Sequence, residues 1–118
     1  MKIYFGGKKI MINFSDIKAT LMPNFKGGEG ITAAQMFVDD KNKIMRITLE
    51  PGSSIGMHCH EDSCEVIYVL EGVGTAVLDG KEETVEAGKC HYCPKGHEHC
   101  FINKGKKDLV FFAVVPQQ

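Results

Sequence analysis

Short apolar segments alternate with polar turns along most of this 118-residue chain, and the alternation predicts β-strands. Glycine, asparagine and aspartate separate the segments, and Asp79-Gly80 is a strong signal for a two-residue hairpin. Short strands at these intervals are typical of an all-β sandwich or barrel. The predicted strands cover residues 32–38, 43–50, 66–70, 75–78, 82–86, 89–93, 98–102 and 108–115.

The first thirty residues differ from the rest of the chain, because their apolar clusters are short and separated by glycines and lysines. Residues 15–22 predict a short helical turn that is capped by Ser15 and ends before a proline. Residues 24–30 contain three glycines and predict a loop. We therefore expect a single domain over residues 1–118, with a core barrel of about residues 31–116 and a short N-terminal extension.

Two of the predicted strands, residues 66–70 and 109–115, are apolar on both faces. One face of each strand can line a barrel, but the other face must also be covered. Either the N-terminal segment lies across this outer face or a second subunit does. We expect a homodimer.

Composition and charge narrow the classes of function. The net charge is −1 with mixed signs, so we expect neither a nucleic-acid nor an anionic-membrane partner. The longest apolar run, Leu109 to Val115, is far shorter than the roughly 20 residues that a membrane span needs. The N-terminus lacks the apolar stretch of a secretion signal, and an odd count of five cysteines is typical of reduced thiols. We therefore expect a cytoplasmic protein.

The segment 52–72 carries the clearest chemistry. His58 and His60 are two residues apart, so both rings point to one face if the segment is a strand. A turn at residues 61–63 can bring Glu65, at the start of the next strand, back beside the two histidines. Two imidazoles and a carboxylate on one face form a metal-ligand set that one more ligand would complete.

A second segment, residues 88–103, has the pattern Gly-x5-Pro-x-Gly-x2-His-x3-Asn, and its histidine is His99. The first segment has the pattern Gly-x5-His-x-His-x4-Glu-x6-Gly. In this order, with only residues 73–87 between them, the two patterns resemble the two motifs of the cupin superfamily at every fixed position. The resemblance covers about a third of the chain. It implies a cupin-like double-stranded β-helix, which is a small jelly-roll barrel.

In cupins the two histidines and the glutamate of the first motif join the histidine of the second around one divalent metal ion. Imidazole and carboxylate donors suit Fe, Mn, Ni, Cu or Zn, and four such ligands on an octahedral ion leave two positions for water or substrate. Two alternatives stay open: ordinary polar residues in a hairpin, or a metal that only stabilises the fold. Carried over by position, the implied ligands are His58, His60, Glu65 and His99.

Two further histidines and a Cys-x-x-Cys lie in or near the second motif. We interpret His97, which follows a turn, as a rim residue able to shuttle protons, and His91 as a half-buried strand residue. Cys90 and Cys93 are three residues apart in a strand, so they face opposite ways and cannot chelate one ion together. We interpret all five cysteines as packing residues, and Cys93 reaches the pocket only if its face of the strand is the inner one.

Arg46 is the only arginine in the chain and lies in the middle of a predicted strand. An inward Arg46 would bind a substrate carboxylate or phosphate with both arms of its guanidinium group. An outward Arg46 would pair with a surface glutamate. Tyr92, within the second motif, has the same two alternatives, so both residues are candidates for a substrate pocket.

The resemblance allows two classes of function. The first is a metal-dependent enzyme acting on a small polar molecule by dioxygenation, isomerisation, decarboxylation or β-elimination, with Glu65 as a candidate general base. The second is a non-catalytic module that binds or senses a small molecule. A transcription regulator is disfavoured, because the chain has neither room for a helix-turn-helix nor a basic face.

Overall fold

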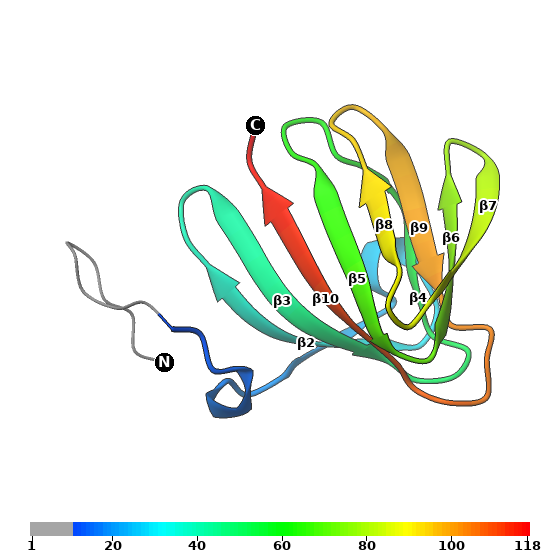
Figure 1. Cartoon of the computed structure of the whole chain (residues 1–118), viewed down its shortest axis with the longest axis horizontal. Helices are drawn as coiled ribbons and strands as arrows, with labels where there is room; N and C mark the ends of the chain where they lie inside the picture. Colours follow the sequence, from blue (N-terminus) through cyan, green and yellow to red (C-terminus); the bar gives the residue numbers. More distant parts are fainter. Residues whose placement is uncertain (1–10) are drawn as a thin grey trace.

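The computed structural model describes residues 11–118, which form ten strands in two antiparallel sheets (Figure 1). The apolar clusters of the N-terminal extension that precede position 11 lie outside the described part of the chain. The strands are β1 (Thr20–Pro23), β2 (Ile31–Val38), β3 (Asn42–Leu49), β4 (Ser54–Cys59), β5 (Glu65–Glu71), β6 (Val73–Leu78), β7 (Lys81–Glu86), β8 (Cys90–Cys93), β9 (Glu98–Ile102) and β10 (Leu109–Pro116).

The larger sheet has the order β1-β2-β3-β10-β5-β8 and the smaller sheet the order β4-β9-β6-β7. Both sheets include neighbours from distant parts of the chain, such as β3 with β10 and β4 with β9, as in a jelly roll, so the predicted all-β barrel is confirmed. Strands β7 and β8 follow each other in the chain, yet they form the outer edges of two different sheets. The Asp79-Gly80 hairpin between β6 and β7 is as predicted, because both residues have positive φ, at 48° and 81°.

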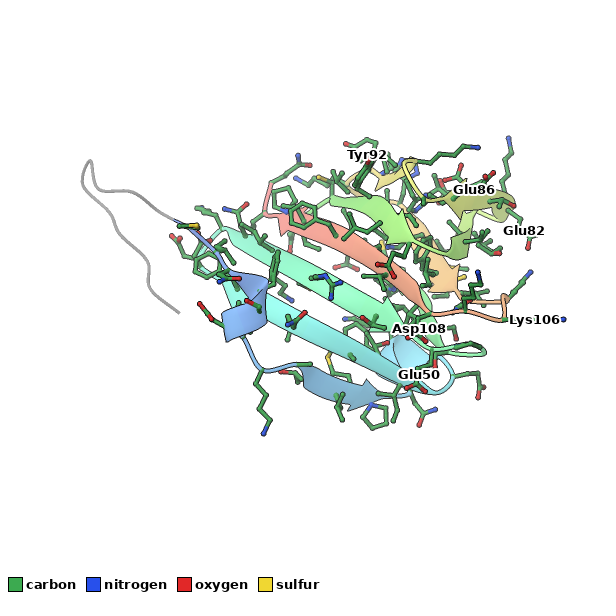
Figure 2. The ribbon with its side chains drawn as sticks, turned by 60° about the horizontal axis from the view of Figure 1, so that its bottom comes forward. Glu50, Glu82, Glu86, Tyr92, Lys106 and Asp108 are labelled. Carbon is green, nitrogen blue, oxygen red and sulfur yellow. The ribbon has the colours of Figure 1, made fainter. Side chains whose placement is uncertain are left out.

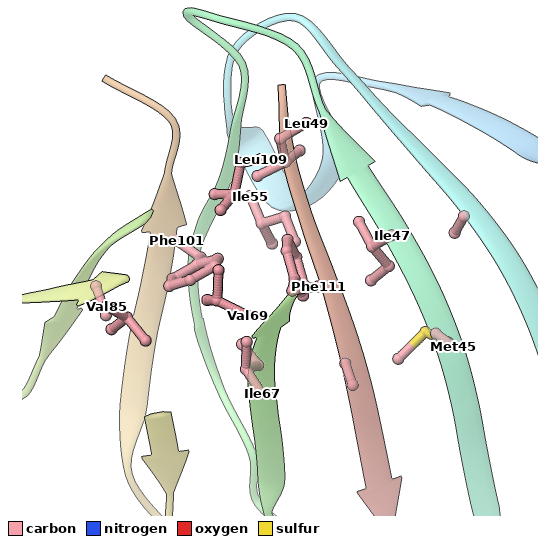
Figure 3. Close-up of a cluster of buried hydrophobic side chains, with 13 residues drawn as sticks. Met45, Ile47, Leu49, Ile55, Ile67, Val69, Val85, Phe101, Leu109 and Phe111 are labelled. Carbon is pink, nitrogen blue, oxygen red and sulfur yellow. The ribbon is translucent and has the colours of Figure 1, made fainter. Parts of the chain in front are cut away.

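The hydrophobic core fills one end of the barrel, where alternate residues of both sheets point inward (Figure 3). Leu49 and Leu109 pair at this end of the larger sheet. The rings of Phe101 and Phe111 meet between the sheets edge to face, with their centroids 4.9 Å apart. Because these side chains are almost completely buried, their removal from water stabilises the sandwich.

The N-terminal segment differs from the predicted helical turn. A short 3-10 helix, η1 (Phe14–Asp16), is capped by Asn13, whose side-chain oxygen accepts from the backbone N–H of Ser15 at 3.2 Å. The cap is therefore not Ser15, and the later part of the segment pairs with β2 as strand β1. The ring of Phe14 packs edge to face on Phe112, so this segment covers part of the outer face of the larger sheet.

The loop before β2 contains a second short 3-10 helix, η2 (Phe25–Gly27), which lies directly on β4. A Cβ atom on Gly28 would lie 2.2 Å from the carbonyl oxygen of Ser54. A Cβ atom on Gly56 would lie 2.1 Å from the carbonyl oxygen of Lys26. Glycine at both positions therefore allows the two backbones to touch.

Candidate metal centre

The structure brings the four predicted ligands together at the end of the barrel opposite the apolar core. His58 lies in β4, His60 follows that strand, Glu65 begins β5 and His99 lies in β9. One donor atom from each side chain lies within 4.8 Å of all the others, so the group could hold a metal ion.

A β-bulge in β4 turns His58 inward. Ile55 pairs with Phe101 and His58 pairs with His99, so three steps along β4 match two steps along β9. Regular alternation would place Ile55 and His58 on opposite faces of the sheet. The extra residue, at positions 56–57, restores His58 to the inner face that Ile55 also occupies.

The donor atoms crowd around one point. The three Nε2 atoms of His58, His60 and His99 are 3.0–3.2 Å apart. Oε1 of Glu65 lies 2.9 Å from Nε2 of His99 and 3.2 Å from Nε2 of His60. Metal–ligand bonds of about 2.1 Å at right angles would separate neighbouring donors by about 3 Å, so these distances suit an octahedral ion.

Each histidine ring is oriented by a hydrogen-bond partner at its other nitrogen. Nδ1–H of His58 donates to the carbonyl oxygen of Gly56 at 2.7 Å. Nδ1 of His60 lies 3.1 Å from Oγ of Ser63, and Nδ1 of His99 lies 2.9 Å from Nε2 of His91. With Nδ1 protonated, the three Nε2 lone pairs point at one another, an arrangement that a shared cation would stabilise.

The protonation states also suit a cation. Burial raises the pKa of Glu65, but the adjacent imidazole rings of His60 and His99 outweigh this effect and lower it to about 2, so the carboxylate is ionised. Burial lowers the pKa of His58 and favours its neutral form. Ionised carboxylates and neutral imidazoles are the forms that bind metals.

A cavity of about 350 Å³ opens onto three of the four ligands, His58, His60 and Glu65. His99 lies behind them and is only 1% exposed. The uncovered side of the cluster therefore faces the cavity. Four charged residues with exposed side chains, Lys26, Lys43, Glu61 and Asp62, lie along its wall. The remaining wall is mainly apolar and includes Met22, Phe25, Met36, Met45, Ile47, Ile55 and Val115.

Arg46 and Tyr92, the two candidates for a substrate pocket, do not line this cavity, so of the two alternatives the outward one holds for both. Met45 and Ile47 point into the barrel, and alternation sends Arg46 between them to the outer face, where its Nη1 donates to Oε1 of Gln35 at 3.5 Å. Tyr92 is 50% exposed and projects from the outside of β8 (Figure 2).

The two additional histidines have different environments. His91 was predicted to be half-buried, but it lies on the inner face of β8 and is fully buried. Its ring stacks on that of His99, with centroids 5.2 Å apart and planes 17° apart. His97 is exposed, as expected for a rim residue, and its hydrogen bond to Asp79 lowers the pKa of that carboxyl group.

Sequence reasoning missed the roles of Ser63 and His91 as partners of the ligand rings. Ser63 was part of the predicted turn, and no spacing rule linked its hydroxyl to His60. The burial of His91 follows from its register, because it pairs with the buried Ile67 in β5. The sequence of β8 alone could not identify the inner face of this strand.

The cysteines are all free thiols, and Cys90 and Cys93 lie on opposite faces of β8, as predicted. Cys93 is on the inner face, where burial and the nearby charge of Glu65 raise its pKa to about 11. It does not line the cavity. Cys59 and Cys90 are exposed, so the interpretation as buried packing residues is wrong for these two, and Cys59 lies at the cavity wall.

A family model for the cupin domain matches residues 45–115, which contain both motifs and run from the middle of β3 almost to the end of β10. The chain belongs to the cupin family. Among curated proteins, this cupin is 30% identical over 115 residues to the oxalate-binding protein of Thermotoga maritima, covering 92% of this chain and 95% of that protein. It is also 32% identical over 62 residues to mannose-1-phosphate guanylyltransferase of Escherichia coli, but that match covers only 13% of the enzyme.

Solved structures agree on the fold of this cupin. A predicted oxalate decarboxylase from Thermotoga maritima superimposes with a TM-score of 0.87 at 30% identity, covering 92% of this chain and all of that one. A cupin-superfamily sugar phosphate isomerase from Silicibacter pomeroyi has a TM-score of 0.72 at 20% identity, covering 92% of this chain and 76% of that one. No helix within residues 11–118 is long and apolar enough to cross a membrane.

Proposed function

We propose that this cupin binds one divalent metal ion through His58, His60, Glu65 and His99, and acts as a metal-dependent enzyme on a small carboxylate. One observation carries the proposal: the uncovered side of the ligand cluster faces the cavity of about 350 Å³. A ligand entering this cavity would meet the positions of the ion that the protein leaves free. A bound divalent ion would supply a Lewis acid for an oxygen atom of the ligand.

The two lysines and the apolar side chains of the cavity suit a carboxylate with an apolar body. Lys26 and Lys43 reach the cavity from η2 and β3, and either ammonium group can pair with a negative charge on the ligand. Methionines contribute much of the apolar wall, and their flexible side chains adapt to ligands of different shape. Two similar proteins carry names that refer to oxalate, the smallest dicarboxylate, which supports the choice of a carboxylate.

A non-catalytic carboxylate-binding protein is the second candidate. The similar Thermotoga maritima protein is named as an oxalate-binding protein, with no reaction in its name. In addition, Glu65 is ionised and contacts two histidines, so it would have to leave the cluster to accept a proton from a ligand.

The test begins with metal-free protein that is titrated with Mn²⁺, Fe²⁺, Co²⁺, Ni²⁺ or Zn²⁺ in calorimetry. Each loaded form is then mixed with oxalate, pyruvate or phenylpyruvate, and binding and product formation are followed by calorimetry and NMR. We expect one metal ion per chain and carboxylate binding only in the loaded forms. Turnover that stops on chelation supports the enzyme, whereas binding without turnover supports the second candidate. Failure of every metal to bind stoichiometrically would overturn both.

We also propose that a second copy of the chain covers the outer face of β5 and β8. Tyr68 and Leu70 of β5 and Tyr92 of β8 are each more than 40% exposed there, and Tyr68 pairs with Phe112 of β10. Within residues 11–118, the N-terminal segment contacts Phe112 but leaves these three residues exposed. Light scattering should give twice the 13.0 kDa of one chain, and Tyr68→Glu should give a monomer. A monomeric wild-type mass at micromolar concentration would refute the dimer.

A further inference from the structure

A chain of hydrogen bonds runs from the molecular surface to the candidate metal centre. Oε1 of Glu83 lies 2.5 Å from Nδ1 of His91, and Nε2 of His91 lies 2.9 Å from Nδ1 of His99. The Glu83 side chain is 51% exposed, whereas His91 is fully buried. His91 is not one of the residues that the cupin motifs assign to the metal.

The chemistry of the three groups fixes where the protons lie. An ionised carboxylate only accepts hydrogen bonds, so Nδ1–H of His91 donates to Glu83. With this proton on Nδ1, Nε2 of His91 carries a lone pair and accepts from Nδ1–H of His99. His99 is left with its lone pair on Nε2, the atom that points at the other ligands.

The fold holds this chain in place from both sheets. Glu83 pairs with the buried Ala76 in the smaller sheet, so its side chain leaves β7 on the inner face. His91 belongs to β8, at the edge of the larger sheet, and its ring lies nearly parallel to those of His99 and Phe101, at 17° to each. The hydrogen bond between Glu83 and His91 therefore connects the edge strands of the two sheets.

Both nitrogens of His91 are occupied, one by Glu83 and the other by His99, so His91 is not a fifth ligand. A role in packing alone would not require either nitrogen. A ligand histidine that donates its second N–H to a fixed acceptor is held in one tautomer and becomes a stronger donor to the metal.

We propose that His91 and Glu83 are positioning residues of the metal centre, which hold His99 in the tautomer that directs Nε2 toward the ion. Glu83 adds negative charge at the surface end of this hydrogen-bond chain. His91 transmits the effect of that charge to His99 through a region from which water is excluded. The inference rests on the metal site of the proposed function, and it adds two residues that act on the metal only through His99.

Metal affinity, measured with a competing chelator and Zn²⁺, tests this role. His91→Phe keeps a buried ring but removes both hydrogen bonds, and we expect the affinity to fall roughly 10- to 100-fold. Glu83→Gln should cause a smaller loss. His91→Gln, whose amide oxygen can accept from His99, should recover part of the affinity, and it replaces His91→Phe if that variant does not fold.

Glu82→Gln is the matched control, because Glu82 directly precedes Glu83 in β7 and projects outward (Figure 2). Its carboxylate pairs with Lys104 at the surface. This variant should bind Zn²⁺ like the wild type. Unchanged affinity in folded His91→Phe, or equal losses in Glu83→Gln and Glu82→Gln, would overturn the inference.

Nitrogen-15 NMR of the imidazole groups provides a readout independent of affinity. In the wild type we expect His99 with a slowly exchanging proton on Nδ1, and in His91→Phe this proton should exchange rapidly. An unprotonated Nδ1 in wild-type His99 would overturn the inference. Because the spectrum can also be recorded without metal, it tests the hydrogen-bond chain even if the wild type fails to bind any ion, an outcome that overturns the proposed function instead.

Discussion

The two ends of the barrel interior are built from the same strands but obey opposite physical rules. Strand β9 contributes Phe101 to one end and His99 to the other, and β5 contributes Val69 and Glu65 in the same way. Apolar side chains gain stability simply by leaving water, whereas imidazoles and carboxylates lose free energy unless partners replace the water. The apolar end should therefore determine whether the chain folds, and the polar end what it binds.

Truncation of a core ring should have the largest effect and should be confined to stability. Phe111 is fully buried and contacts Phe101. Phe111→Ala should reduce the free energy of unfolding by about 3–5 kcal/mol. Urea denaturation measures the loss, and zinc titration below the unfolding transition should give unchanged stoichiometry. Loss of zinc binding in the folded variant would show that the two ends are coupled.

The reverse experiment removes a ligand from the polar end. His58 is partly exposed to the cavity, so His58→Ala should change the unfolding free energy of the metal-free protein by no more than about 1 kcal/mol. It should abolish tight, stoichiometric zinc binding, because one of four ligands is lost. Zinc should raise the melting temperature of the wild type but not of this variant. An equal zinc-induced increase in the melting temperature of both proteins would show that His58 is not a metal ligand.

Of the two ends of the barrel interior, as formed by residues 11–118, only the polar end contains groups that titrate as the pH falls. The folded-state pKa of Glu65, about 2, is below its ordinary value of 4.5, so its contribution to stability is complete above pH 4.5 and is lost as pH falls toward 2. His58 also has a lowered pKa, so its contribution declines as pH falls below 6.5. The urea midpoint of the metal-free protein should therefore decrease as the pH is lowered. In Glu65→Gln this decrease should be smaller below pH 4.5. The same decrease below pH 4.5 in Glu65→Gln as in the wild type would show that Glu65 is not the group responsible.

The smallest effects should come from β3, which lines the cavity with one face and forms part of the outer surface with the other. Met45 faces the cavity, and Met45→Ala should weaken binding of phenylpyruvate to the metal-loaded protein about 3- to 10-fold, because apolar contact is lost. Arg46→Ala, one residue further, should leave this affinity unchanged. Calorimetry measures both affinities. A larger loss of affinity in Arg46→Ala than in Met45→Ala would show that Arg46 contacts the ligand.

Local alternation predicted eight of the ten strands, and the resemblance to the two cupin motifs predicted the four candidate ligands. Alternation identifies the inner face of β3, and His58, His60 and Glu65 lie close together in the chain. The bulge in β4 was not predictable, since Ile55 and His58 have opposite parity in the sequence. The burial of His91 and the cavity between β1, η2 and β3 depend on contacts between distant segments, which no local pattern encodes.

The contact between η2 and β4 restricts how this cupin can vary. Any side chain at position 28 or 56 would collide with a main-chain carbonyl group, and replacing one glycine cannot make room for a substituent at the other. A saturation library at the two sites should return the same pair in every folded clone. Neighbouring positions in the cavity wall, such as Met22 and Lys26, are free of this restriction, so new ligand preferences can evolve there while the support beneath them stays invariant.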